Sequence, residues 1–196
     1  LRGSLIHDSL AELYSTMPSL KDIQSWSEKE KQSRIEKAVN EIFNKEIRGS
    51  NSILKRIFEL EKSRAETILY AFLMEEVKRD YFQTNEVEKK LTFTHAHLNL
   101  HLKVDRVDLQ EDDTIHVIDY KTGAAKNIID MKNNIVSFQL FVYAAAMQKQ
   151  PSTLSFINLK DTQTINFITA GLHDFKQSKN NKHKSLDIES GIRNVR

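Results

Sequence analysis

The chain contains no cysteine among its 196 residues, so disulfide bonds and cysteine-ligated zinc or iron–sulfur centres are excluded. This absence fits an intracellular protein, and we expect a cytoplasmic location. No apolar run approaches the roughly 18 residues that a membrane span needs, and the N-terminus lacks the basic-then-apolar layout of a signal peptide. We therefore expect no membrane partner.

An excess of charge of either sign is also missing. The chain has 29 lysines and arginines against 27 aspartates and glutamates, which gives a net charge of +2 at pH 7. No overall field marks it as a nucleic-acid-binding protein, so any basic surface has to be local. One basic run, at 175–185, has four lysines and a histidine without an acid. It suits phosphate contacts, although such a run near a terminus is more often a solvated end.

The length suits one domain with a sizeable core. We expect residues 1–196 to form a single domain with a helical portion (1–80), a sheet core with a packed helix (81–170) and a basic tail (171–196). Because the chain begins with Leu1 and opens directly in a helical pattern, we expect it to be a fragment of a longer protein.

Hydrophobic periodicity predicts helices first and strands afterwards. Apolar residues recur at helical spacing in three stretches before Asp80, and the third, about 52–79, would span about 40 Å. In that helix, Ile53, Ile57 and Leu60 are expected to continue the apolar stripe of the later turns. After Asp80 the period falls toward two, which predicts three consecutive strands. A nearly all-apolar helix at 136–147 and a final hairpin follow.

The stretch 104–123, VDRVDLQEDDTIHVIDYKTG, places carboxylates where a core would prefer aliphatic side chains. If it is a hairpin whose turn is 111–113, counting outward from the turn sets Asp105 directly opposite Asp119, on one face of the sheet. A turn with an even number of residues would offset this pair by one position.

Asp119 and Lys121 are two residues apart on one strand, so their side chains leave the same face while that of Tyr120 points away. With Asp105, this gathers two carboxylates and an ammonium. Like charges this close repel, and a bound divalent cation is the simplest way to keep both carboxylates ionised. Oxygen ligands suit Mg²⁺ or Mn²⁺. Charged residues make up 29% of the chain, so a D-x-K triplet alone is also common by chance.

Other features lie near this stretch or at helical positions. The apolar alternation slips between Val104 and Val107, which indicates a bulge of the kind often found beside active sites. His7 falls in the first turn of a predicted helix, where a surface or satisfied core histidine is the more frequent case. Gln139 and Tyr143 share one face of the apolar helix. They either reach the site or a bound strand, or bond only to the protein.

Four motifs occur in a fixed order along the chain. They are G-x-x-x-H (3–7), L-K-V-D-R-V-D (102–108), V-I-D-Y-K-T-G (117–123) and Q-L-F-V-Y (139–143). In this order they resemble the PD-(D/E)XK nuclease superfamily, in particular its RecB/AddB-like exonuclease branch. The resemblance implies a restriction-endonuclease-like core. Its class is α/β, an α+β arrangement in which a central mixed sheet is flanked by helices and follows an N-terminal helical portion.

The resemblance also implies roles for individual residues. His7, Asp105 and Asp119, with the backbone carbonyl of Tyr120, would bind Mg²⁺ or Mn²⁺. Asp105, Asp119 and Lys121 would be catalytic, with Lys121 positioning the attacking water and steadying the charge that develops on phosphate.

Three further residues are candidates for substrate contacts. These are Gln139, Tyr143 and Arg106, of which Arg106 is either structural or phosphate-facing. The implied function is a divalent-metal-dependent DNA exonuclease in DNA repair or recombination. Its partners would be DNA and a helicase, a recombination protein or other domains of the same longer chain.

Two other functions remain open. One is a catalytically inactive nucleic-acid-binding clamp of the same fold, against which the intact Asp105, Asp119 and Lys121 argue. The other is a purely structural module, which would require both carboxylates to be paired with lysine or arginine in a closed corner.

The chain departs from the family pattern in two respects. Leu102 stands where the family usually has glycine, and we expect it to crowd the approach of a DNA backbone. The cysteines that hold an iron–sulfur cluster in several relatives are missing, so we expect no such cluster. The long helices before Asp80 are the expected substitute for its contribution to stability.

Overall fold

The computed structural model describes residues 2–47, 51–95, 98–123, 128, 137–147, 151–163 and 165–171. The basic run at 175–185 lies outside these residues, as does Val136, the expected start of the apolar helix. The helices are α1 (Arg2–Leu13), α2 (Leu20–Ser25), α3 (Glu28–Ile47), α4 (Ser52–Glu76) and α5 (Gln139–Ala146). The strands are β1 (Phe82–His95), β2 (Leu98–Gln110), β3 (Ile115–Lys121), β4 (Thr153–Asn158) and β5 (Asn166–Gly171).

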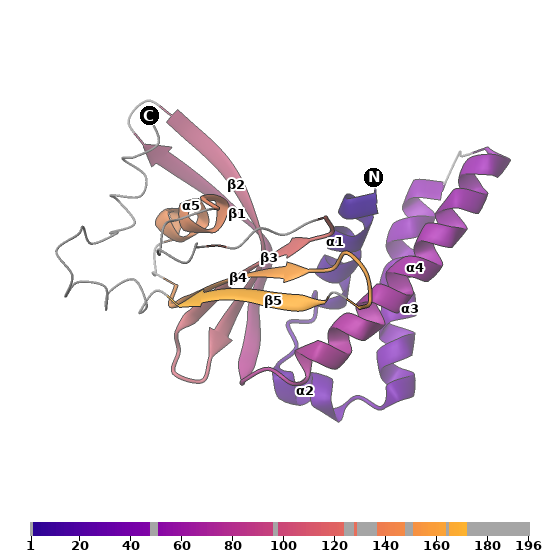
Figure 1. The fold of residues 1–196 in the computed structure, drawn as a ribbon, viewed down its shortest axis with the longest axis horizontal. Helices are drawn as coiled ribbons and strands as arrows, with labels where there is room; N and C mark the ends of the chain where they lie inside the picture. Colours follow the sequence, from indigo (N-terminus) through magenta and orange to yellow (C-terminus); the bar gives the residue numbers. More distant parts are fainter. Residues whose placement is uncertain are drawn as a thin grey trace.

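The five strands form one mixed sheet in the order β1-β2-β3-β4-β5. All neighbours are antiparallel except β3 and β4, which are parallel because α5 lies in the connection between them. Helix α5 lies on one side of the sheet, and α1, α3 and α4 lie on the other (Figure 1). The predicted mixed sheet flanked by helices, with a helical N-terminal portion, is confirmed.

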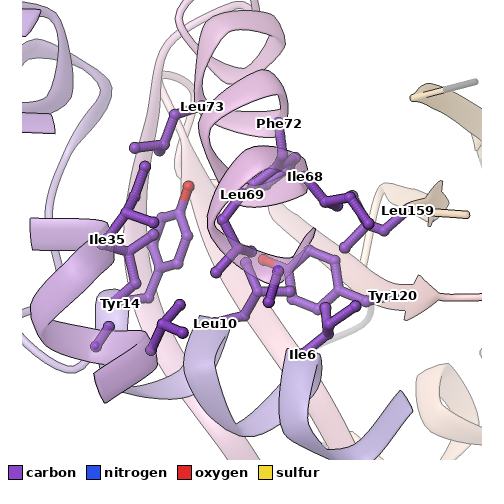
Figure 2. Packing of buried hydrophobic residues seen from close by; sticks show 14 of the residues in the cluster. Ile6, Leu10, Tyr14, Ile35, Ile68, Leu69, Phe72, Leu73, Tyr120 and Leu159 are labelled. Atoms are coloured by element: carbon purple, nitrogen blue, oxygen red, sulfur yellow. The ribbon is translucent and has the colours of Figure 1, made fainter. Parts of the chain in front are cut away.

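The larger core lies between the N-terminal helices and the sheet (Figure 2). Alternation along β3 sends Ile118 and Tyr120 into this core, where Leu69 and Phe72 of α4 are fully buried. The edge of the Tyr120 ring meets Phe72 at a centroid distance of 5.7 Å. Within the described residues, no helix is both long and apolar enough to cross a membrane.

The first turns of α4 depart from the prediction. Ile53, Ile57 and Leu60 are 72%, 48% and 69% exposed, and Phe58 is buried instead. The prediction of one continuous apolar stripe was therefore wrong for this half of the helix. At 100° per residue these three side chains drift away from the face that later carries Leu69 and Phe72 into the core.

A smaller core lies under α5. Leu140 and Ala144 of this helix pack with Val107 of β2 and Val117 of β3, and all four are fully buried. Residues 107 and 117 are partners in the β2–β3 register, so one helix covers the centre of this strand pair. Asp119, near the end of β3, is thereby held beside α5.

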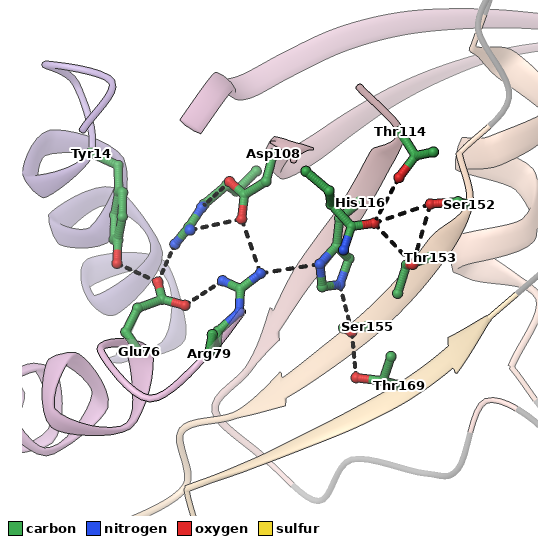
Figure 3. Close-up of polar contacts among 12 residues, drawn as sticks. Tyr14, Glu76, Arg79, Asp108, Thr114, His116, Ser152, Thr153, Ser155 and Thr169 are labelled. Carbon is green, nitrogen blue, oxygen red and sulfur yellow. Dashed lines mark hydrogen bonds and ion pairs between the residues drawn. The ribbon is translucent and has the colours of Figure 1, made fainter. Parts of the chain in front are cut away.

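A buried network of charges joins the helical layer to the sheet (Figure 3). The Arg106 guanidinium, wholly buried on β2, donates to Asp108 at 2.6 and 2.8 Å and to Glu76 near the end of α4. Arg79 bridges the same two carboxylates. Tyr14 of α1 donates to Glu76 and also lies against the Arg106 guanidinium, 4.0 Å from ring centroid to Cζ. Two cations thus balance two anions.

The charges of this network keep Glu76 ionised. Burial alone would raise the pKa of Glu76, but the charges of Arg106 and Arg79 and the hydrogen bonds from Tyr14 and Arg106 lower it to about 2. Such a group is costly to bury without its partners. The network therefore specifies how α4 docks on β2.

His116 extends the network across the sheet. Its Nδ1 lies 3.1 Å from Arg79, which can only donate, so Nδ1 accepts and Nε2 carries the proton. Nε2 then donates to Ser155 Oγ at 2.7 Å, and this hydroxyl contacts Thr169 at 2.7 Å. Burial and the neighbouring charges of Arg79 and Arg106 hold the pKa of His116 well below its usual value of 6.5.

Replacing Arg106→Met is expected to lower the free energy of unfolding by about 3–5 kcal/mol, because two buried carboxylates lose their shared partner. Urea unfolding followed by circular dichroism measures this change. The exposed Arg64→Met variant is the control and should stay within about 0.5 kcal/mol of wild type. A loss below about 1 kcal/mol for Arg106→Met would show that the network contributes little.

His116 should make the protein less stable in mild acid. Below pH 6.5 the unfolded chain gains a proton on this histidine that the folded protein excludes, so stability falls by up to about 1.4 kcal/mol per pH unit. In His116→Gln, whose amide can accept from Arg79 and donate to Ser155, the loss between pH 7.5 and 5.5 should be smaller. Equal losses in the two proteins, from urea unfolding at both pH values, would refute this assignment.

Candidate functional site

The predicted site residues lie where the end of β3 meets α1, β2 and α5. The β2–β3 register pairs Arg106 with Ile118 and Val107 with Val117. Counting one step further sets Asp105 opposite Asp119, and the backbone N–H of Tyr120 donates to Asp105 Oδ2 at 2.8 Å. The predicted hairpin register is confirmed by the observed strand pairing. The turn has the three predicted residues, and Asp113 in it has a positive φ of 59°.

The predicted slip in the alternation is also present. Val104 and Val107 both pack in the core under α5 although they are three residues apart. The β1–β2 pairing omits Asp105, and Glu88 on the facing strand has a φ of 51°. The β1–β2 register is the same on both sides of Asp105, and the register shift of this pair lies in β1 between Thr84 and Glu86. The irregularity lets Asp105 point toward α1 instead of into either core.

Helix α1 brings His7 to this carboxylate. Its Nδ1 lies 3.3 Å from Asp105 Oδ1, and its ring meets the edge of Tyr120 at a centroid distance of 6.1 Å. Burial would lower the pKa of His7, but the hydrogen bond with Asp105 and the charges of Asp105, Asp119 and Glu88 raise it above 6.5. The imidazole is thus held among carboxylates at the open edge of the site.

Gly3 explains how α1 approaches so closely. A Cβ atom at this position would meet Thr122 Oγ1 at 3.0 Å, which is tighter than most Cβ contacts. A larger residue here would require Thr122 or the helix to shift by a few tenths of an ångström. The glycine of the G-x-x-x-H motif thus suits the close approach of helix and strand, and the histidine one turn later faces Asp105.

Helix α5 supplies the other half of the site. Gln139 in its first turn accepts from Lys121 Nζ at 2.7 Å and donates from Nε2 to Asp119 Oδ1 at 2.8 Å. The same amide group donates to the Tyr143 hydroxyl at 2.6 Å, and this hydroxyl lies 3.4 Å from Asp119 Oδ1. Of the two roles predicted for Gln139 and Tyr143, the structure supports contact with the site. They hold Asp119 and Lys121 in place.

One oxygen of Asp119 is contacted by Lys121 alone. Its Oδ2 is buried, lies 2.5 Å from the Lys121 ammonium as an ion pair, and receives no other donor within the described residues. Burial and the charge of Asp105 raise the pKa of Asp119, and Lys121 and His7 offset this only in part. The ionised pair of carboxylates is therefore short of positive charge.

Arg106 stands apart from the other candidates. It is wholly buried on the face opposite Asp119 and spends its donors on Glu76, Asp108 and the Tyr120 hydroxyl, the last at 3.3 Å. Of the two roles that the sequence left open for it, the structure supports the structural one. Because its guanidinium is buried, Arg106 has no exposed donor for the expected contact with substrate.

The donor set fits a hard divalent cation. It offers one imidazole and two carboxylates, with an Asp119 oxygen that Lys121 alone contacts within the described residues, and such oxygen-rich sets suit Mg²⁺ or Mn²⁺. No three histidine, aspartate or glutamate side chains among the described residues are already gathered into a metal-holding cluster. His7 is paired with Asp105, and Lys121 is paired with Asp119. The fit of the site to a divalent cation therefore rests on the chemistry of its donor atoms.

Comparison with known proteins decides the family. The family model of the PD-(D/E)XK nuclease superfamily matches residues 1–194. The chain belongs to the PD-(D/E)XK nuclease superfamily. It is also similar to an ATP-dependent helicase/deoxyribonuclease subunit of Lachnoclostridium phytofermentans, with 31% identity over 181 residues. That alignment covers 81% of this chain but only 15% of the relative, so the chain spans a small part of that protein's length.

Sequence reasoning missed several residues that support this PD-(D/E)XK site. Glu88 adds negative charge beside His7 and pairs with Lys103, and Tyr14, Glu76 and Arg79 hold the strands from behind. A hint for Glu88 was its position opposite the slip at Asp105. The other three gave no signal, because a buried charge and a surface charge look alike in a helical pattern.

Neutralising one of the paired acids should stabilise the metal-free protein. Asp119→Asn removes repulsion from Asp105 and keeps the contact with Gln139, so we expect a gain of about 0.5–2 kcal/mol in unfolding free energy. Urea unfolding in EDTA at pH 7.5 measures this gain. Glu59→Gln, an exposed acid on α4, serves as the neutral control. If the Asp119→Asn protein were less stable than wild type, the inference that the two acids repel each other in the folded protein would be wrong.

Proposed function

We propose that the chain is the nuclease domain of a DNA-processing enzyme and hydrolyses phosphodiester bonds with the help of Mg²⁺ or Mn²⁺. The observation that carries the proposal is the convergence of Asp105 and Asp119 between His7 and Lys121, four side chains from three elements. His7 and Lys121 keep 27% and 30% of their side-chain surface exposed. The corner is therefore partly exposed at these two residues, above two buried carboxylates, which argues against a purely structural module.

The proposed metal ligands are the side chains of His7, Asp105 and Asp119 and the backbone carbonyl of Tyr120. When bound, a divalent cation lowers the pKa of a water and withdraws charge from a phosphoryl oxygen. Asp105 is fixed by the N–H of Tyr120, so one of its oxygens stays directed at His7. Fixed ligands of this kind need little reorganisation when substrate arrives.

Lys121 is the proposed group that faces the phosphate. Its ammonium is held between Asp119 and Gln139, both at hydrogen-bonding distance, and it remains partly exposed. A cation in this position orients the attacking water and stabilises the charge that develops on the phosphate in the transition state. Gln139 binds both Lys121 and Asp119, so its role is to fix the distance between ammonium and carboxylate.

The substrate, the partner, the mode of cleavage and the biological role are also proposals. The similar protein of Lachnoclostridium phytofermentans is named a helicase/deoxyribonuclease, which supports DNA as the substrate and a helicase, on the same or another chain, as the partner. We propose an exonuclease acting in DNA repair or recombination. The alternative, an inactive DNA-binding clamp of the same fold, has no use for two neighbouring carboxylates that have one ammonium and one histidine between them.

A cleavage assay tests this function. Labelled single-stranded and duplex DNA should be degraded with Mg²⁺ or Mn²⁺ and left intact in EDTA. Lys121→Met should lower kcat by about 10²–10³-fold, as loss of one transition-state donor does, and Asp119→Ala should abolish cleavage. In parallel, Mn²⁺ should raise the melting temperature of wild type but not of Asp119→Ala. DNA binding without cleavage by wild type would instead identify the clamp.

A further inference from the structure

The outer half of the β1–β2 hairpin presents an exposed polar face. Strands β2 and β3 pair only over residues 106–109, whereas β1 and β2 stay paired out to 95 and 98. Figure 1 shows this half extending past the other three strands. Three cross-strand pairs lie on its exposed face and form what we call the polar row: Lys90 with Lys103, Thr92 with His101, and Thr94 with Asn99.

The other face of the same half is apolar and covered in part. Leu91 and Leu102 are cross-strand partners and pack, partly buried, against the core under α5, whereas Leu100 further out is 38% exposed. Side chains alternate between faces, so the polar row points away from α5, on the side of the sheet that carries α1. Leu102, expected to crowd a DNA backbone, is turned into the core and leaves the exposed face clear.

The composition of the polar row suits a phosphate backbone. No acid occurs between Lys89 and Val104, in a chain with 27 acids, and the row offers ammonium, hydroxyl, amide and imidazole groups. Thr94 donates to Asn99 Oδ1 at 2.8 Å, which leaves the amide N–H₂ of Asn99 to donate outward. Lysine, threonine and asparagine are frequent donors to DNA phosphates. An ordinary solvent-facing strand pair would mix both signs of charge.

The row begins beside the proposed catalytic site. Lys103 lies two residues before Asp105 on β2 and forms an ion pair with Glu88 of the facing strand. From Lys103 the row runs outward over four residues, about 13 Å at about 3.3 Å per residue. The phosphates of one DNA strand repeat along its backbone, so a row of this length can contact a few successive phosphates.

We propose that the polar row binds the phosphodiester backbone of the DNA strand that leads into the site. This inference rests on the proposed function. It adds the location of the DNA strand beyond the bond that is cleaved. The hairpin acts as a rigid arm, held by α5 on one face, and the phosphates follow its other face toward Lys103. DNA extending a few nucleotides from the cleaved bond gains affinity, and an end that stops at the cleaved bond does not.

The double variant Lys90→Glu/His101→Glu tests the proposal. Both positions are exposed, so the variant should fold normally, as its melting temperature will show. Fluorescence anisotropy with a labelled DNA 12-mer, with Ca²⁺ in place of Mg²⁺, should give a Kd at least tenfold higher than wild type. The salt dependence of log Kd should also become shallower by about 1. With Mg²⁺, KM should rise while kcat stays within about twofold.

The matched control is Lys55→Glu/Ser63→Glu, which changes the net charge equally on exposed positions of α4. It should bind DNA as wild type does. An unchanged Kd in the row variant, an equal loss in the control, or a wild type that binds no DNA would overturn the inference. A wild type that binds DNA without cleaving it would refute the proposed hydrolysis alone, and the Kd comparison would still decide the role of the row.

Discussion

The guanidinium of Arg106, buried between Glu76 and Asp108, is the interaction on which this fold depends. Removing three charges from water is repaid only if every partner is in place, so α4 and β2 have one acceptable docking. The same guanidinium reaches the Tyr120 hydroxyl on β3. Asp105 precedes Arg106 and Asp119 precedes Tyr120. The pair of strands that presents the two acids on one side is therefore anchored on the other side.

The two faces of this strand pair carry opposite electrostatic conditions. On the helical face, two cations meet two anions and each carboxylate is bonded. At the site, Asp105 and Asp119 have one ammonium and one histidine between them, and burial and Asp105 raise the pKa of Asp119. A domain can keep such an imbalance at its surface only if the rest of it is well satisfied. The buried network provides that stability directly beneath the site.

Local rules predicted the hairpin and its register, because a period of two and a three-residue turn fix which side chains oppose each other. They could not bring His7 to Asp105 across about a hundred residues of sequence, and only the family resemblance did so. Local rules also did not predict that Arg106 and Glu76 are buried together. A polar residue in an amphipathic pattern is assigned to solvent unless its partner is known, and these partners come from other elements.

The irregularity at Asp105 connects the site with the arm beyond it. Before the slip, Leu102 and Val104 face α5, and after it Val107 and Leu109 do, so the alternation reverses within one step. In an unbroken strand Lys103 and His101 would share the face of Val107 and meet α5. The reversal turns them to the side of α1, where His7 contacts Asp105. One local break in the pleat thus aims a carboxylate at the site and exposes the polar row that leads to it.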